Sequence, residues 1–222
     1  EAFSLLNIHV DIVEWRVDWF DDVEEIEKIK DVLKELAAVL KDIPLLFTFR
    51  TFKEGGQKAI DLKAYAQLNN AVAATGLVDL IDVEAFTDDE SVKDIIEYVH
   101  SVGVKVIASN HDFAKTPSKE DIIYRLKKMQ DLGADICKIA VMPKSKLDVL
   151  ELLEATVIML ENYADRPIAT MSMSSTGVIS RLAGEIFGSA LTFAAAKKAS
   201  APGQIEVETL YEIMQLLHKT TS

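Results

Sequence analysis

The sequence predicts an α/β protein, folded as a single (β/α)8 TIM barrel over residues 1–222. Three observations predict this class: short apolar runs alternate with amphipathic stretches, the alternation continues along the chain, and polar residues end most of the runs. Such alternation also suits an open doubly wound sheet. The polar strand ends favour the barrel, because a barrel gathers the ends of its strands into one central site.

Seven apolar runs rich in β-branched residues predict the strands. In chain order they are VDIVEWRVD (10–18), PLLFTFR (44–50), LVDLIDVEAF (77–86), VKVIASNHDF (104–113), ADICKIAVMP (134–143), RPIATMSM (166–173) and SALTFAAA (189–196). An eight-stranded barrel needs one more, and residues 1–9 read as the end of a helix. We therefore expect the first βα unit of the barrel to be missing from this chain, and we expect activity to require it.

Four amphipathic stretches between these runs predict helices, because their apolar residues recur at three and four positions. They span residues 23–40, 91–103, 118–133 and 145–164. Their ends carry the expected signals, with Ser118 opening one helix and Gly103 and Gly133 closing two others.

The charge balance limits the partners of the chain. It has 24 basic and 36 acidic residues and a net charge of -12, which argues against a general affinity for nucleic acid or anionic membranes. The single Cys137 cannot form an internal disulfide, and no apolar run approaches the roughly 20 residues of a membrane-spanning helix. We expect a cytoplasmic protein that binds a small molecule, with any anionic ligand held by a local cluster.

Lys138 is the first candidate for chemistry because it interrupts an apolar strand. Strand alternation places it on the same face as Ile136, Ala140 and Met142. Burial there disfavours an ammonium group and so favours the neutral amine that attacks a carbonyl. The alternative is a lysine whose stem packs while its amine reaches solvent at the strand end.

His111 ends the preceding predicted strand and is the side chain best suited to moving a proton near neutral pH. Glu54 lies on a loop made pliable by Gly55 and Gly56 and is a candidate to tune this histidine. The alternatives are a core histidine bonded to a backbone carbonyl and an ordinary turn at Glu54.

Charged residues at two further strand ends are candidates for ligand binding. Glu14, Arg16 and Asp18 share one strand face, and Arg50 ends the next run. Buried charges are costly unless they are paired or bind a ligand, so an ion-pair network is the alternative, above all for Asp18.

Arg181 follows the strand at residues 166–173 and suits bidentate binding of a carboxylate. Residues 197–205 form a loop of small residues that contains Ser200 and Gln204. This composition suits a lid over a bound ligand, although a plain connection has the same composition.

Seven segments, in order, resemble the motif set of the type I 3-dehydroquinate dehydratase family. They are EWRVD, TFRTFKEGG, NHDF, KIAVMP, TMSM, GVISRLAGEIFGSALTF and ASAPGQI, and they span essentially the whole chain. The combination of KIAVMP, ISRLAGE and SAPGQ is highly specific. The resemblance implies a (β/α)8 barrel of the shikimate pathway that needs no metal or organic cofactor and forms a homodimer.

The resemblance also implies a role for each candidate residue. Lys138 would form a Schiff base with 3-dehydroquinate, His111 would act as general base and acid, and Glu54 would tune His111. Substrate binding would fall to Glu14, Arg16, Arg50, Met171, Met173, Arg181, Ser200 and Gln204. The expected reaction is a syn elimination that gives 3-dehydroshikimate. Two mild departures from the family pattern are Ser174 and Ala194, which stand where smaller residues, glycine especially, are common.

The sequence also allows three other functions. A class I aldolase also uses a barrel lysine, but aldolases often bind phosphate through glycine-rich loops where this chain has MSMSSTG and KKASAPGQ. A metal site could draw oxygen ligands from Glu14, Asp18, Glu84 and Asp112, although their spacing matches no known ligand pattern. The third alternative function is that of a barrel fragment that only binds a ligand. Such a protein does not require an imine-forming lysine beside a histidine.

Overall fold

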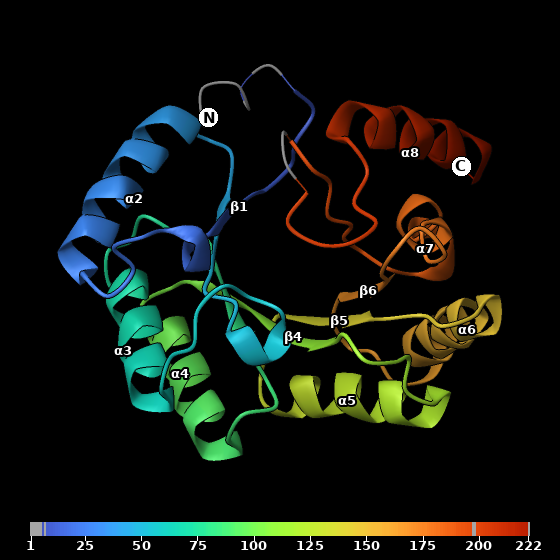
Figure 1. Cartoon of the computed structure of the whole chain (residues 1–222), viewed down its shortest axis with the longest axis horizontal. Coiled ribbons are helices and arrows are strands. Elements are labelled where there is room, and N and C mark those ends of the chain that lie inside the picture. Colours follow the sequence, from blue (N-terminus) through green and yellow to red (C-terminus); the bar gives the residue numbers. More distant parts are fainter. Residues whose placement is uncertain (1–5, 7, 197–198, 222) are drawn as a thin grey trace. The chain divides into compact units, whose positions relative to one another are not determined.

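The computed structural model describes residues 6, 8–196 and 199–221, and these form two compact units. The first unit holds the described residues up to Ser109 together with Leu132–Asp135, and the second holds Asn110–Asp131 and the described residues from Ile136 onward. Strands and helices alternate in both units, as Figure 1 shows. The chain therefore has the predicted α/β class.

The first unit contains parallel strands that pair in chain order, β1 to β2 to β3 to β4. Its elements are β1 (Val13–Arg16), η1 (Val17–Trp19), α2 (Ile26–Leu40), β2 (Leu45–Thr48), η2 (Phe52–Glu54), α3 (Leu62–Ala73), β3 (Leu80–Glu84), α4 (Asp89–Ser101) and β4 (Lys105–Asp112), whose last three residues belong to the second unit. Helix α3 packs beside both α2 and α4 (Figure 1).

The core of the first unit is formed by apolar side chains between these strands and helices. Ile29 and Leu33 of α2, Phe47 of β2, Ile81 of β3 and Val106 of β4 are all completely buried. Burial of side chains of this size contributes about 1.5–3 kcal/mol each, so this core fixes the strand ends on which the polar candidates lie.

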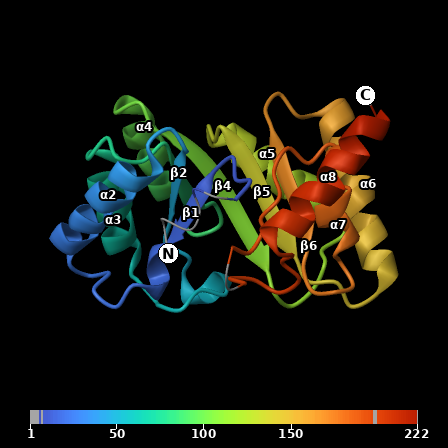
Figure 2. The same ribbon diagram turned by 90° about the horizontal axis from the view of Figure 1, so that it is seen from above.

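The second unit contains two paired parallel strands and the helices that pack on them. Its elements are α5 (Lys119–Asp131), β5 (Ile136–Val141), α6 (Lys146–Asn162), β6 (Ile168–Ser172), α7 (Ile179–Leu182), η3 (Glu185–Phe187) and α8 (Val207–Thr221). Helices α5 and α6 lie side by side, and α7 packs against both β6 and α8 (Figure 2). The register sets Lys138 opposite Ala169 and Ala140 opposite Met171.

Six of the seven predicted strands and all four predicted helices are confirmed, with ends shifted by a few residues. The helix-ending glycines are also confirmed, since Gly103 and Gly133 adopt φ values of 83° and 96°. Within the described residues, the structure adds α3, α7 and α8 to the four predicted helices, together with 3-10 turns such as η1. Asp18 consequently lies in η1 rather than at the end of a strand with Glu14 and Arg16.

The strand predicted at residues 189–196 is wrong. The Ala190 amide donates to the Ile168 carbonyl at 2.8 Å, and Ala195 forms an isolated bridge with Glu206. Between these two ties the segment forms no strand ladder. It is an extended connection held at both ends, because its backbone pairs at single residues instead of along a neighbouring strand.

The predicted single domain and the absent first βα unit stay predictions, and residues 1–5 and 7 of the lead-in lie outside the described residues. Among the helices that the structure describes, none combines the length and the apolar character needed to cross a membrane.

Asp135 provides a test of the polar contacts that fasten β4. Its carboxylate accepts hydrogen bonds from the Lys105 ammonium and the Val106 amide, both at 2.8 Å, and lies 2.7 Å from Nε2 of His100. Burial raises the pKa of Asp135, but these three contacts outweigh it and hold the pKa below its usual value. The stabilisation is therefore present above the unfolded-state pKa of about 3.9 and is lost as pH falls through the lower folded value.

We expect Asp135→Asn to lower the free energy of unfolding at pH 7 by about 1 kcal/mol, since the site is partly exposed. Urea unfolding at pH 7 and at pH 3 measures the difference between variant and parent. The difference should shrink at the lower pH, and a difference that stays constant would contradict the assigned role of the charge.

Candidate active site

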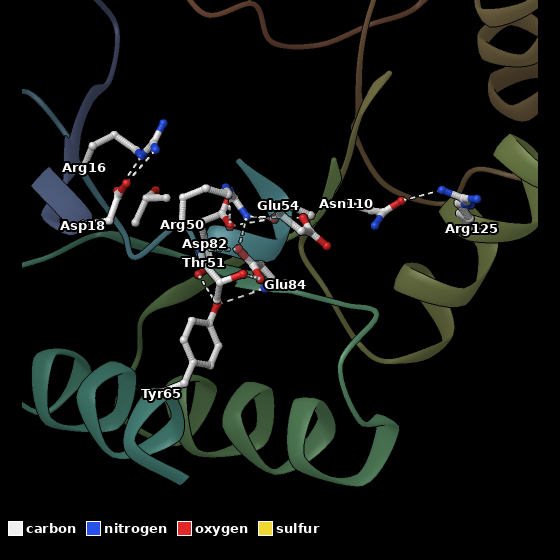
Figure 3. Close-up of polar contacts among 12 residues, drawn as sticks. Arg16, Asp18, Arg50, Thr51, Glu54, Tyr65, Asp82, Glu84, Asn110 and Arg125 are labelled. Carbon is white, nitrogen blue, oxygen red and sulfur yellow. Dashed lines mark hydrogen bonds and ion pairs between the residues drawn. The ribbon is translucent and has the colours of Figure 1, made fainter. Parts of the chain in front are cut away.

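Arg50 is the centre of a buried polar group in the first unit, which we call the Arg50 cluster: Arg50, Thr51, Glu54, Tyr65, Asp82, Glu84 and Ser109 (Figure 3). Arg50 follows β2 and is only 3% exposed. Its Nη2 donates to Asp82 at 2.7 Å, and its Nη1 donates to Glu84 at 3.0 Å and to Ser109 at 2.9 Å. The guanidinium is thus bound by residues of the two following strands.

Carboxylates determine the electrostatics of this cluster. Burial alone would lower the pKa of Arg50, but the charges of Asp82, Glu84 and Glu54 outweigh burial and raise it above its ordinary value. The Tyr65 hydroxyl accepts from the Glu84 amide at 3.0 Å and donates to the Asp82 carbonyl at 3.3 Å. Burial, followed by the charges of Glu84 and Asp82, raises the pKa of Tyr65, so the phenol stays protonated.

Glu84 also fastens the turn that carries Glu54. Its carboxylate accepts from the Thr51 amide and the Thr51 hydroxyl, both at 2.7 Å. The Thr51 carbonyl in turn accepts from the amides of Glu54 and Gly56. A side chain at Gly56 would overlap the Arg50 carbonyl, so the close turn requires glycine there. Glu54 itself is 9% exposed and its carboxylate lies 3.6 Å from Arg50.

The charged side chains of β1 and η1 are used mainly within the protein. Arg16 binds Asp18 through two hydrogen bonds of 2.7 and 2.9 Å, and Asp18, which is completely buried, also accepts from the Gln57 amide (Figure 3). Glu14 accepts from the Thr48 hydroxyl at 2.9 Å. The interpretation of Asp18 as part of an ion pair is therefore confirmed. Two nitrogens of the Arg16 guanidinium are used in this pair.

His111 lies at the end of β4 in the second unit and is half-buried. Its neighbours in sequence, Asn110 and Asp112, both contact Arg125. Arg125 of α5 donates to the Asn110 side chain at 2.9 Å and lies 3.7 Å from the Asp112 carboxylate (Figure 3). Asp112 also accepts from the amides of Ala114 and Lys115, both at 3.0 Å. The backbone on either side of His111 is thus held in place.

Lys138 lies near the middle of β5 and is 3% exposed, so the alternative of a lysine that reaches solvent does not apply. Its Nζ lies 4.4 Å from the centre of the Phe193 ring. Ala140, on the same strand face, packs with Met171, Met173, Met142 and Phe193. The nucleophile candidate is therefore buried beside an apolar wall of methionine and aromatic side chains.

Cys137 precedes Lys138 and points to the opposite face of β5. It is completely buried, and burial raises the pKa of its thiol to about 12. The thiol is therefore protonated and unreactive near neutral pH.

Arg181 is the most unusual charged residue of the second unit. It is 1% exposed, and burial lowers the pKa of its guanidinium to about 10. Its Nη1 donates to the Phe193 carbonyl at 3.4 Å and to the Met171 sulfur at 3.7 Å, and its Nη2 donates to the Pro202 carbonyl at 3.4 Å. Its Nε has no hydrogen-bond partner among the described residues. A buried guanidinium with such weak contacts is prepared to bind an anion.

Ser200 and Gln204 bind each other in the described part of the predicted lid. The Gln204 carbonyl oxygen accepts from the amides of Ser200 at 2.7 Å and Ala201 at 3.3 Å, and its amide donates to the Ser200 hydroxyl at 3.2 Å. The preceding loop contacts them, because the Ser174 amide donates to the Pro202 carbonyl at 3.2 Å. Ser174 has a φ of 59°, a left-handed conformation that glycine adopts more readily than other residues.

The structure thus brings together Lys138, Met171, Met173, Phe193 and Arg181 in one unit. Two residues of these sites, Asp82 and Phe193, are not predicted from the sequence. Asp82 lies two residues before Glu84 on the same strand face, and this pair of acidic residues in an apolar strand is a signal for a buried basic partner such as Arg50.

The proposed oxygen ligands for a metal all have other partners. Glu14 accepts from the Thr48 hydroxyl, Asp18 pairs with Arg16, Glu84 pairs with Arg50, and Asp112 accepts from backbone amides. In the ranges that the structure describes, histidine, cysteine and acidic residues form no group of three or more able to hold a metal ion.

Comparison with known proteins gives the class of the molecule and then its family. The crystal structure of a type I 3-dehydroquinate dehydratase from Clostridium difficile, with covalent modified comenic acid, matches with a TM-score of 0.96 and 58% identity, over 99% of this chain and 86% of that one. The 3-dehydroquinate dehydratase structure from Geobacillus kaustophilus HTA426 matches with a TM-score of 0.96 and 35% identity, over 100% of this chain and 86% of the other. The molecule is therefore an α/β enzyme.

The sequence matches agree with the structures. The family model of type I 3-dehydroquinase matches residues 1–221. The 3-dehydroquinate dehydratase of Bacillus licheniformis is 56% identical over 99% of this chain and 86% of the relative. The chain belongs to the type I 3-dehydroquinase family, which confirms the resemblance inferred from its motifs.

The dependence of the Arg50 cluster on Glu84 can be tested by unfolding experiments. Glu84→Ala leaves the Arg50 guanidinium and the Thr51 amide buried with fewer partners, so we expect a loss of about 3 kcal/mol or more in the free energy of unfolding. Urea denaturation followed by circular dichroism measures it. The matched control is Glu97→Ala, because Glu97 is exposed and lies 3.8 Å from Lys93 at the surface. Its effect should stay within about 0.5 kcal/mol, and equal effects of the two changes would refute the anchoring role.

Proposed function

We propose that this chain dehydrates 3-dehydroquinate to 3-dehydroshikimate in the shikimate pathway through a Schiff base on Lys138. The observation that carries this proposal is the position of Phe193, which contacts two charged residues at once. Its ring lies 4.4 Å from Nζ of Lys138, and its carbonyl accepts from Arg181 at 3.4 Å. A buried amine and a buried guanidinium thus lie against the same residue.

This pair suits a substrate that has both a ketone and a carboxylate. The amine can attack the ketone carbon. Arg181 has an Nε without a hydrogen-bond partner among the described residues and weak contacts that a carboxylate would replace. Carboxylate binding by Arg181 would also restore charge balance to a buried cation. A class I aldolase that binds phosphate is less compatible with this chain, because the segments MSMSSTG and KKASAPGQ lack the glycine-rich composition of a phosphate-binding loop.

The reaction begins when Nζ of Lys138 attacks C3 of 3-dehydroquinate and water is lost, leaving an iminium. This positive centre withdraws electrons from the neighbouring carbon and so acidifies the C2 proton. His111 then removes that proton as the general base. The resulting enamine expels the C1 hydroxyl group, to which His111 returns the proton, and hydrolysis of the imine releases the product. Because one histidine serves both groups, the elimination is syn.

The remaining candidates act on the substrate hydroxyl groups or on His111. Glu14, Arg16 and Arg50 would bind hydroxyl groups, and Glu54 would tune the basicity of His111. Ser200 and Gln204 would close over the substrate, exchanging the hydrogen bonds that they make to each other for bonds to the ligand. Met171 and Met173 would form the pocket wall. We also propose that the chain acts as a homodimer, as the family resemblance implies.

The relatives support a covalent mechanism. The related enzyme from Clostridium difficile carries covalent modified comenic acid in its crystal structure. Covalent modification of that protein is consistent with a reactive side chain in the family site. The direct test for this chain is the ultraviolet absorbance of the conjugated product after mixing with 3-dehydroquinate, and a protein that only binds its ligand would give none.

Lys138 is expected to be the only residue that bonds to the substrate. Lys138→Ala should reduce turnover to the limit of detection, and borohydride reduction of the parent in the presence of 3-dehydroquinate should add a substrate-derived mass at this residue. Peptide mass spectrometry locates the adduct. Lys105→Ala is the control, since Lys105 is exposed at the start of β4, and it should keep turnover. An adduct on another residue would overturn the assignment.

Arg181 is expected to act mainly in binding the carboxylate. Arg181→Gln should raise KM by about 100-fold, because a charge-assisted contact worth about 3 kcal/mol is lost, and Arg181→Lys should recover part of it. Steady-state kinetics with 3-dehydroquinate measure both. Arg166→Gln is the control, because Arg166 pairs at the surface with its neighbour Asp165. If KM is unchanged in Arg181→Gln, carboxylate binding lies elsewhere.

A further inference from the structure

Phe193 has a feature that substrate binding does not require. Its ring centre lies 4.4 Å from Nζ of Lys138, well within the distance at which a cation is attracted to an aromatic face. The residue is fixed by its backbone, since its carbonyl accepts from Arg181 and the segment is tied at Ala190 and Ala195. An aromatic face is therefore held against the reacting nitrogen.

The surroundings of this nitrogen create a difficulty for Schiff-base chemistry. Lys138 is 3% exposed and lies beside the apolar cluster of Ala140, Met171 and Met173. Such surroundings favour the neutral imine over the charged iminium, because burial disfavours charge. Only the iminium withdraws electrons strongly enough to acidify the neighbouring carbon. A group that favours positive charge at Nζ therefore helps to keep the Schiff base protonated.

We propose that the ring face of Phe193 holds the Schiff base of Lys138 in its protonated form. The inference rests on the proposed function and adds a residue to it. In the step concerned, the lysine amine and the ketone form a carbon–nitrogen double bond, one proton is taken up, and the carbonyl oxygen leaves as water. The positive charge remains on the nitrogen, and the negative face of the ring stabilises it there.

The ring can stabilise the iminium without accepting the proton on Nζ. A carboxylate at the same position would accept a proton from the iminium, whereas an aromatic face has no basic site. The ring thus offsets part of the cost of burying the charge while leaving the proton on nitrogen.

The test replaces Phe193 with phenylalanine carrying one, two or three ring fluorines, which weakens the negative face with little change in shape. We expect kcat to fall with each fluorine, by roughly tenfold in all, and the yield of borohydride-trapped adduct on Lys138 to fall in parallel. Phe193→Leu, which keeps an apolar side chain, should lose about as much as the most fluorinated form. Circular dichroism and urea unfolding check that each variant folds.

Tyr163→Leu is the matched control. Lys127 lies 4.4 Å from the Tyr163 ring centre, the same distance as in the Lys138 pair, but both residues are exposed. Loss of this surface contact should leave kcat unchanged.

The outcomes separate the inference from the proposed function. A fluorine series in which kcat and trapping stay constant, while the parent still forms the Lys138 adduct, would overturn the role of the ring and leave the Schiff base intact. If kcat stays constant through the fluorine series and falls strongly only in Phe193→Leu, the ring contributes shape and apolar contact, and the proposed electrostatic role is wrong. If the parent forms no adduct at Lys138, the proposed function itself fails.

Discussion

The ion pairs of Arg50 with Asp82 and Glu84 are the interaction on which the first unit depends. These contacts join the ends of β2 and β3, and Ser109 of β4 donates to Asp82 within the same cluster. Burying one guanidinium among carboxylates is costly for each group alone, so the charges are stable only as a set. These contacts fix the ends of the strands relative to one another. They also position the turn that carries Glu54, because Glu84 binds Thr51 at the start of that turn.

The two buried arginines illustrate opposite uses of the same side chain. Carboxylates surround Arg50 and raise its pKa, whereas burial lowers the pKa of Arg181. Within the part of the chain that the structure describes, Arg181 has weak contacts and its Nε has no hydrogen-bond partner. The first arrangement stabilises the fold. The second leaves a buried cation with few contacts in the protein alone, which is the arrangement that we propose for binding the substrate carboxylate.

Periodicity was sufficient to predict six strands and four helices, because burial of one face leaves a regular pattern in the sequence. It was also sufficient to select Lys138, since a lysine inside an apolar strand is conspicuous. It failed at residues 189–196, where an apolar composition suggested a strand but only the ends of the segment pair. The partners of Arg50 and the contact between Lys138 and Phe193 also escaped prediction, because they join residues 32 or more positions apart and periodicity describes only neighbours.

The burial of Cys137 has a consequence for the selectivity of the chemistry. A thiol is intrinsically the better nucleophile toward many electrophiles, and this one is adjacent in sequence to the lysine. With its pKa raised to about 12 and its side chain on the far face of β5, it is withheld from any ketone that reaches Lys138. The alternation of a single strand therefore keeps the thiol and the proposed nucleophile on opposite faces of β5, and oxidants that attack exposed thiols have no access to the residue next to Lys138.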